Sequence, residues 1–120
     1  MERPTVLIVE DEPSLRTLIR RMLEAADYAV REACNGADAL AQCRDAHVDL
    51  IITDVCMPHF DGVSLVRHLA RKPSAPLFLV ISAHDMPAEL PEGAVFLRKP
   101  FARHELLAHV RLLLPCQAVA

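Results

Sequence analysis

Short runs of apolar residues alternate with longer amphipathic stretches along the chain. The first run, Thr5–Val9, is unbroken and rich in β-branched residues, which is typical of a strand covered on both faces. Pro13 is suited to a first helical turn, and the apolar residues that follow recur at the spacing of one helical face: Leu15, Leu18, Ile19, Met22, Leu23 and Ala26. This stretch therefore predicts a buried strand followed by an amphipathic helix.

The same alternation continues to the end of the sequence. Further strands are predicted at residues 29–33, 50–53, 77–81 and 94–98, and further helices at about 35–46, 61–70 and 103–114. In the first of these helices we expect Ala37, Leu40 and Ala41 to face inward. Between residues 82 and 94 there is room for only about two turns of helix, bounded by Pro87 and Pro91.

Five buried strands alternating with amphipathic helices predict an α/β fold, a doubly wound five-stranded parallel sheet with helices on both faces. We expect one domain over residues 1–120, with a core at about 4–114. Such sheets bind ligands beyond the carboxyl ends of their strands. The polar residues that end the strands are therefore the candidate site: Glu10, Asp11, Asp54, Ser82 and Lys99.

Composition narrows the class of protein. With 120 residues, 52% of them hydrophobic, and a net charge of -3, the chain can bury a core and has no bulk attraction to nucleic acid or anionic membranes. No apolar run is long enough for a membrane span or a secretory signal, so we expect a cytoplasmic protein without membrane insertion. The four cysteines and six histidines lack the spacings of zinc sites.

Three carboxylates at one sheet edge repel each other and need a cation among them. Lys99 is one candidate, and Mg²⁺ is the other because oxygen ligands from Asp11, Asp54 and a loop carbonyl suit it. A carboxylate beside Mg²⁺, an ammonium and a hydroxyl is arranged to attack phosphorus. Asp54 is the candidate nucleophile.

Four stretches, V-L-I-V-E-D-E-P, I-I-T-D-V-C-M-P-H-F-D-G, L-V-I-S-A and L-R-K-P-F, occur in the order found in the receiver domains of two-component response regulators. The chain resembles that family over nearly its whole length. The resemblance implies that Asp54 accepts a phosphoryl group from a phosphohistidine, that Ser82 hydrogen-bonds this group and that Lys99 pairs with it. It also implies a Mg²⁺ site made of Glu10, Asp11, Asp54 and the main-chain carbonyl of Cys56.

The resemblance further implies a flavodoxin-like strand order of 2-1-3-4-5, a cis Lys99-Pro100 peptide and an aromatic switch residue, Phe96, that acts together with Ser82. Partners would be a sensor histidine kinase or histidine phosphotransfer domain and an unknown downstream protein, with no turnover of a free substrate. We expect a stand-alone monomer or weak phosphorylation-dependent dimer without direct nucleic-acid contact, since no basic helix-turn-helix segment follows the last helix. His84 and Cys56, each two positions past a site residue, are hypothesised to modulate loss of the phosphoryl group.

The chain departs from the family pattern in several places. Glu10 stands where aspartate is commoner, Ser82 where threonine is commoner, and Phe96 where tyrosine is commoner. The stretch from Ser82 to Lys99 is roughly five residues shorter than the family leads us to expect, beyond ordinary boundary error. We therefore expect helix four to be shortened.

Two other functions are compatible with the predicted sheet. A flavin mononucleotide binder would need a phosphate loop of small hydroxyl and glycine residues after the first strand, where Glu10, Asp11 and Glu12 would repel a phosphate. A receiver-like interaction module that works without phosphorylation is favoured by the short stretch before the last strand. The acidic residues and Lys99 favour the phosphorylated receiver instead.

Overall fold

The computed structural model of this chain describes residues 3–55, 62–87 and 90–115. Within them the strands β1 (Thr5–Val9), β2 (Ala29–Ala33), β3 (Leu50–Asp54), β4 (Leu77–Ser82) and β5 (Val95–Arg98) form one parallel sheet in the order β2-β1-β3-β4-β5. The described helices are α1 (Pro13–Ala25), α2 (Gly36–Asp45), α3 (Gly62–Ala70) and α4 (Arg103–Leu113). The predicted doubly wound sheet is confirmed, including its strand order. None of these helices has the length and apolar character needed to cross a bilayer.

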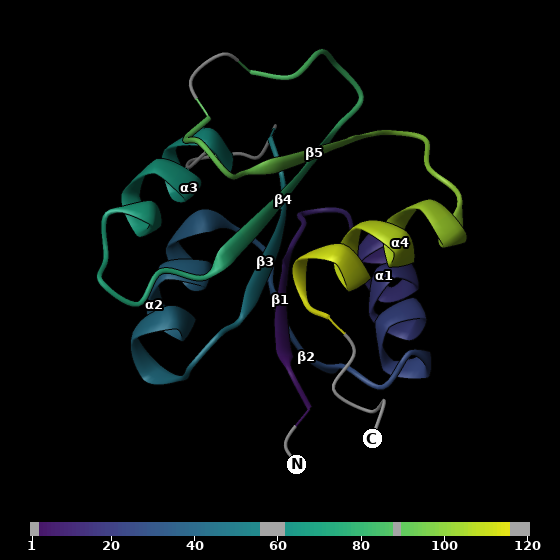
Figure 1. The fold of residues 1–120 in the computed structure, drawn as a ribbon, viewed down its shortest axis with the longest axis horizontal. Coiled ribbons are helices and arrows are strands. Elements are labelled where there is room, and N and C mark those ends of the chain that lie inside the picture. Colours follow the sequence, from purple (N-terminus) through teal and green to yellow (C-terminus); the bar gives the residue numbers. More distant parts are fainter. Residues whose placement is uncertain (1–2, 56–61, 88–89, 116–120) are drawn as a thin grey trace.

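The sheet stands between two helical layers, with α1 and α4 on one face and α2 and α3 on the other (Figure 1). Alternate residues of β1 point into separate cores because side chains of a strand alternate between faces. Val6 and Ile8 belong to the core under α1 and α4, whereas Leu7 and Val9 belong to the core under α2 and α3. All four are fully buried, as expected for a central strand of a parallel sheet.

Two residues expected to face inward are exposed. Leu18 of α1 is 49% exposed, because α1 buries a narrow stripe around Ile19 and Leu23 and Leu18 lies outside it. Ala37 of α2 is also exposed, and Gly36 and Ala39 are buried in its place. The inward position was therefore wrong for one residue in each helix, because tertiary packing determines which part of an apolar stripe is covered.

The segment between β4 and β5 corrects the expectation of a shortened helix. Its described residues, 83–87 and 90–94, contain no helix, and a turn precedes β5. Pro87 and Pro91 each lack the N–H that a helix interior requires, and Gly93 adopts a left-handed conformation with φ 94°. Arg98 of β5 ties the segment down through a 2.5 Å contact with Asp85. The described part of this segment is therefore irregular chain with one turn.

An ion-pair network joins α1 to β2 and predicts a pH-dependent stability. Arg16 and Arg20 both donate to Glu32, and the hydrogen bond from Arg20 is the main reason that the pKa of Glu32 is lowered. A lowered native pKa stabilises the fold above the unfolded pKa, and this contribution disappears as pH falls through the native value. Glu32→Gln should therefore lower the free energy of unfolding by about 1 kcal/mol at pH 7 and by much less near pH 3. Urea unfolding at the two pH values measures this, and an equal loss at both would contradict it.

Candidate functional site

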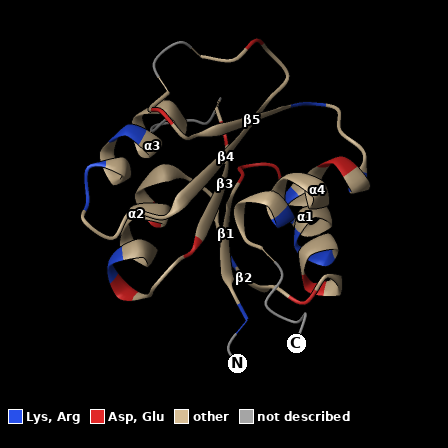
Figure 2. Ribbon diagram, in the orientation of Figure 1, with Lys and Arg blue, Asp and Glu red and all other residues tan. Residues whose placement is uncertain are grey.

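Three carboxylates meet where β1 and β3 end. Glu10 directly follows β1, Asp11 comes next, and Asp54 is the last residue of β3, which is hydrogen-bonded to β1. Oxygen atoms of the three carboxylates lie within 4.8 Å of one another. Glu10 and Asp54 are only 1% and 7% exposed, whereas Asp11 is exposed. Figure 2 shows the acidic colour where β1 leads into α1.

Lys99 supplies a cation to this cluster from the end of β5. Its Nζ donates to Asp54 Oδ2 at 2.6 Å and to Glu10 Oε1 at 3.3 Å. Burial disfavours the ammonium, but the hydrogen bond to Asp54 and the charges of Asp54 and Glu10 outweigh it and raise the pKa of Lys99. Lys99 is therefore a fixed positive charge between the two buried carboxylates. The Lys99-Pro100 peptide is cis, as expected.

Three carboxylates meet beside one lysine in this cluster, so its formal charge is negative. Burial, joined by the negative charge of Asp54, raises the pKa of Glu10, although the N–H of Glu12 donates to Glu10 Oε2 at 3.1 Å and Lys99 also acts in the opposite direction. A further cation close to such a carboxyl would favour its charged form. Carboxylate oxygens are the ligands of hard divalent cations. The residues present therefore fit a Mg²⁺ ion.

Ser82 lies on the strand next to β3, at the same edge of the sheet. It is 1% exposed, and its Oγ accepts a hydrogen bond from the His84 main-chain N at 2.9 Å. The main-chain N of Lys99 donates to the Ser82 carbonyl at 2.7 Å, which holds the ends of β4 and β5 together. The polar residues predicted at the strand ends thus share one edge of the sheet.

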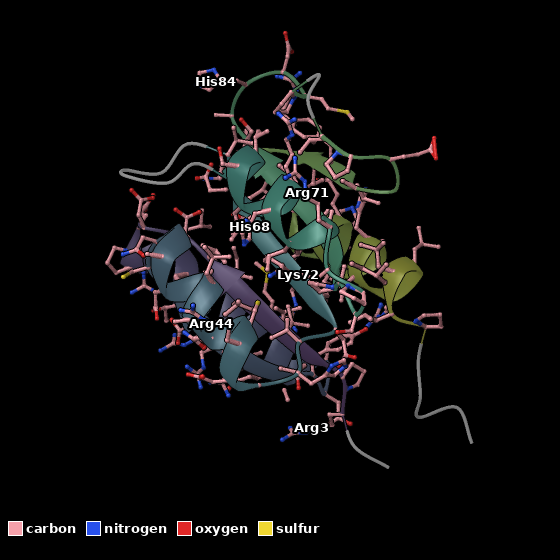
Figure 3. The ribbon with its side chains drawn as sticks, turned by 90° about the vertical axis from the view of Figure 1, so that its left-hand side faces the viewer. Arg3, Arg44, His68, Arg71, Lys72 and His84 are labelled. Atoms are coloured by element: carbon pink, nitrogen blue, oxygen red, sulfur yellow. The ribbon has the colours of Figure 1, made fainter. Side chains whose placement is uncertain are left out.

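Two other predicted residues, Phe96 and His84, do not belong to the acidic cluster. Phe96 of β5 is half-buried against the core under α2 and α3. His84 is exposed, and its side chain projects from the segment after β4 (Figure 3). Cys56, predicted to offer a carbonyl ligand and to modulate the site, lies outside the described residues.

The sequence did not predict several residues that hydrogen-bond the main chain of the cluster. Arg16 Nη1 donates to the Glu10 carbonyl at 2.7 Å, and Thr53 Oγ1 donates to the Asp54 carbonyl at 3.0 Å. The N–H of Gly62 donates to the Val55 carbonyl at 2.9 Å, so the start of α3 lies against the end of β3. The Asp61-Gly62 pair in the sequence is a signal that could have indicated this close approach. No sequence pattern could have indicated the role of Arg16.

The sequence matches the family described as "Response regulator receiver domain" over residues 6–111. Transcriptional regulatory protein ResD of Bacillus subtilis is 34% identical over 114 residues, which are 91% of this chain and 47% of that protein. Response regulator MprA of Mycobacterium avium is 37% identical over 114 residues, again 91% of this chain and 50% of that protein. The chain thus spans about half the length of these curated relatives.

Solved structures agree with this match. Chemotaxis response regulator CheY4 of Vibrio cholerae superposes with a TM-score of 0.84 at 31% identity, covering 93% of this chain and 99% of that one. Response regulator TrrA of Thermotoga maritima, solved in complex with Mg²⁺-BeF, superposes with a TM-score of 0.85 at 27% identity, covering 92% of this chain and 99% of that one.

Proposed function

The chain belongs to the response regulator receiver domain family, and on this premise we propose that Asp54 accepts a phosphoryl group from a phosphohistidine. The observation that carries the proposal is the 2.6 Å contact of Lys99 Nζ with Asp54 Oδ2 inside the cluster of three carboxylates. A buried carboxylate held beside a cation and a candidate metal site has what in-line attack on phosphorus requires. The family is not one of conventional enzymes, and the act that we propose modifies the protein itself.

In the proposed reaction, an oxygen of Asp54 attacks phosphorus while the phosphorus–nitrogen bond of the donor breaks. The imidazole leaves with the bonding electrons and takes up a proton. The Lys99 ammonium neutralises the phosphoryl oxygens, and the Ser82 hydroxyl donates a hydrogen bond to one of them. Glu10, Asp11 and Asp54 would hold Mg²⁺ together with the Cys56 carbonyl, and the ion, when bound, supplies further neutralisation of the phosphoryl charge.

Phosphorylation would then shift the population of the segment that leads from β4 to β5. A phosphoryl group adds charge and acceptor oxygens, and the Ser82 hydroxyl is one strand away from Asp54. Ser82 moving toward it would open space for Phe96, which is half-buried on the neighbouring strand. The surface made by β5, α4 and residues 83–87 and 90–94 would carry the output to a partner protein. Modulation by His84 and Cys56 stays a prediction.

Family membership implies a histidine kinase partner. We propose that this kinase, or a phosphotransfer domain, docks on α1 beside the site. Leu18 supports the proposal, because it is an exposed large apolar residue, 49% accessible, on the helix that directly follows Glu10 and Asp11. The cytoplasm, where such kinases place their phosphohistidine, is the proposed location.

Mg²⁺-dependent labelling by acetyl phosphate tests the proposed function. The intact mass of the protein should rise by one phosphoryl group with Mg²⁺ and stay unchanged when the metal is chelated. The absence of helix from the described residues 83–87 and 90–94 favours a second candidate, an interaction module that works without phosphate. No mass gain with Mg²⁺ present and the fold intact would contradict the phosphorylation proposal and support that module.

Lys99→Met should separate metal binding from phosphorylation. Without the ammonium, Glu10 and Asp54 lose their positive partner, so Mg²⁺ affinity should rise about tenfold as the ion meets less competition for the same oxygens. Acetyl phosphate labelling should nevertheless fall about 100-fold, because a donor to the phosphoryl oxygens is gone. Calorimetric titration with Mg²⁺ and intact mass measure the two effects. Lys72→Met, at the chain's other lysine, should change neither, and an unaltered Mg²⁺ affinity in Lys99→Met would contradict the proposed ligand set.

A further inference from the structure

A hollow of about 540 Å³ lies between α2 and α3, on the opposite side of the sheet from α1 and α4. Its lining is mainly apolar and includes Leu40, Cys43, Val48 and Leu69. Residues 46–48, 73, 74 and 76 complete it, and these precede β3 and β4. The hollow is therefore at the amino ends of these strands, whereas Asp54 and Ser82 lie at their carboxyl ends.

Basic side chains surround this hollow. Arg44, His47, His68 and Lys72 line it, and among the described residues no aspartate or glutamate does. In Figure 3, Arg44, His68 and Lys72 lie around α2 and α3 on one side of the molecule, and His84 lies at the other end. This grouping is notable in a chain whose net charge is -3.

Three of the four basic residues that line the hollow lack a carboxylate partner in the described part of the chain, as do some arginines elsewhere, such as Arg21 and Arg67. Arg16, Arg20, Arg98 and Lys99 each contact a carboxylate. Of the basic residues that line the hollow, only His47 has a carboxylate neighbour, Asp49, within ion-pair distance in the described part of the chain. Arg44 and Lys72 are also exposed, so both charges are available to a molecule entering from solvent.

We propose that this hollow binds a small organic anion, with a carboxylate or phosphate held by Arg44 and Lys72 and a flat apolar body seated on Leu40, Val48 and Leu69. The volume lies within the roughly 300–1,000 Å³ of small-molecule sites, which are apolar with a few convergent polar groups. Burial raises the pKa of the Cys43 thiol, so this lining residue carries no negative charge that would repel the anion.

Helix-end electrostatics alone do not account for this arrangement. Arg44 and His68 lie in the last turns of α2 and α3, where cations are favoured by the negative end of the helix dipole. That effect requires no cavity, and it does not explain Lys72, which follows α3 and lies beside an apolar lining. The combination of unpaired cations with an apolar hollow favours an amphipathic anion as occupant.

Calorimetric titration with 2-naphthoate, matched by neutral 2-naphthamide, tests the proposal. The carboxylate should bind saturably and at least ten times more tightly than the amide, since one charge-assisted contact is worth about that factor. Adenosine monophosphate and adenosine form a second matched pair. Charge-dependent binding of either anion supports the proposal, and the tighter one identifies the class as aromatic acid or nucleotide.

Variants locate the binding and keep it separate from phosphorylation. Arg44→Gln and Lys72→Gln should each weaken 2-naphthoate binding about tenfold, whereas Arg21→Gln, on α1 across the sheet, should not. Amide shifts in ¹⁵N spectra should change at residues 40–48 and 68–76. Asp54→Ala should bind as the wild type does, so failure of phosphorylation and failure of this proposal are distinguishable. Equal binding of acid and amide, shifts confined to other residues, or unaltered binding by both Gln variants would each overturn the proposal.

Discussion

Asp54→Ala should abolish the Mg²⁺-dependent mass gain with acetyl phosphate, reducing labelling by at least about 100-fold. The reason is chemical, because alanine has no oxygen to attack phosphorus. Asp54→Asn should behave alike, since an amide oxygen of similar shape is a far poorer nucleophile. The fold should survive both changes, because Asp54 ends β3 and is not part of either apolar core. Intact mass and circular dichroism melting measure the two outcomes.

Glu12→Gln is the matched control for this experiment. Glu12 is exposed, lies beside Glu10 and Asp11, and is absent from the group of carboxylates that meet within 4.8 Å. Its contribution to Glu10 is a main-chain N–H, which the substitution keeps. Glu12→Gln should therefore be labelled at the wild-type rate. A full mass gain in Asp54→Ala would show that another group accepts the phosphoryl, and peptide mapping would then name it.

The sequence predicted that Glu10, Asp11 and Asp54 lie together, because a parallel sheet leaves little freedom at its carboxyl edge. Once residues 5–9 and 50–53 are identified as buried neighbouring strands, Glu10 and Asp54 must lie at the same edge. Ser82 and Lys99 follow by the same reasoning from β4 and β5. The contact of Lys99 with both buried carboxylates was expected only as charge balance, and the structure supplies its geometry.

The features that could not be predicted depend on packing between distant segments. Leu18 and Ala37 fit their helical stripes, but which part of each stripe is covered depends on where the helix docks on the sheet. The absence of helix from residues 83–87 and 90–94 was not predicted, although Pro87 and Pro91 each lack the main-chain N–H that a helix interior needs. The hollow between α2 and α3 belongs to no sequence motif, since its lining comes from residues 37–48 and 68–76 together.

Gly62→Ala adds a single methyl group near the site, and we expect this substitution to destabilise the fold strongly. A Cβ at position 62 would lie 2.1 Å from the Asp54 carbonyl oxygen and 3.1 Å from Thr53 Oγ1. The first of these atoms is backbone of a buried strand, so it cannot move without shifting the end of β3 or the start of α3. Such overpacking should cost about 3 kcal/mol and lower the melting temperature by roughly 10 °C. Because the displaced carbonyl belongs to Asp54 itself, labelling by acetyl phosphate should also slow.

Gly93→Ala separates this clash from the general effect of replacing glycine. Gly93 has φ 94° and nothing within 4 Å of an added Cβ, so its substitution introduces backbone strain without a collision. That strain should cost about 1 kcal/mol and leave the labelling rate unchanged, since it arises in the turn before β5. Thermal melting and labelling of the two variants side by side measure both effects. A smaller loss of stability in Gly62→Ala than in Gly93→Ala would show that α3 moves away from β3 at little cost, and would remove the proposed constraint on the position of Asp54.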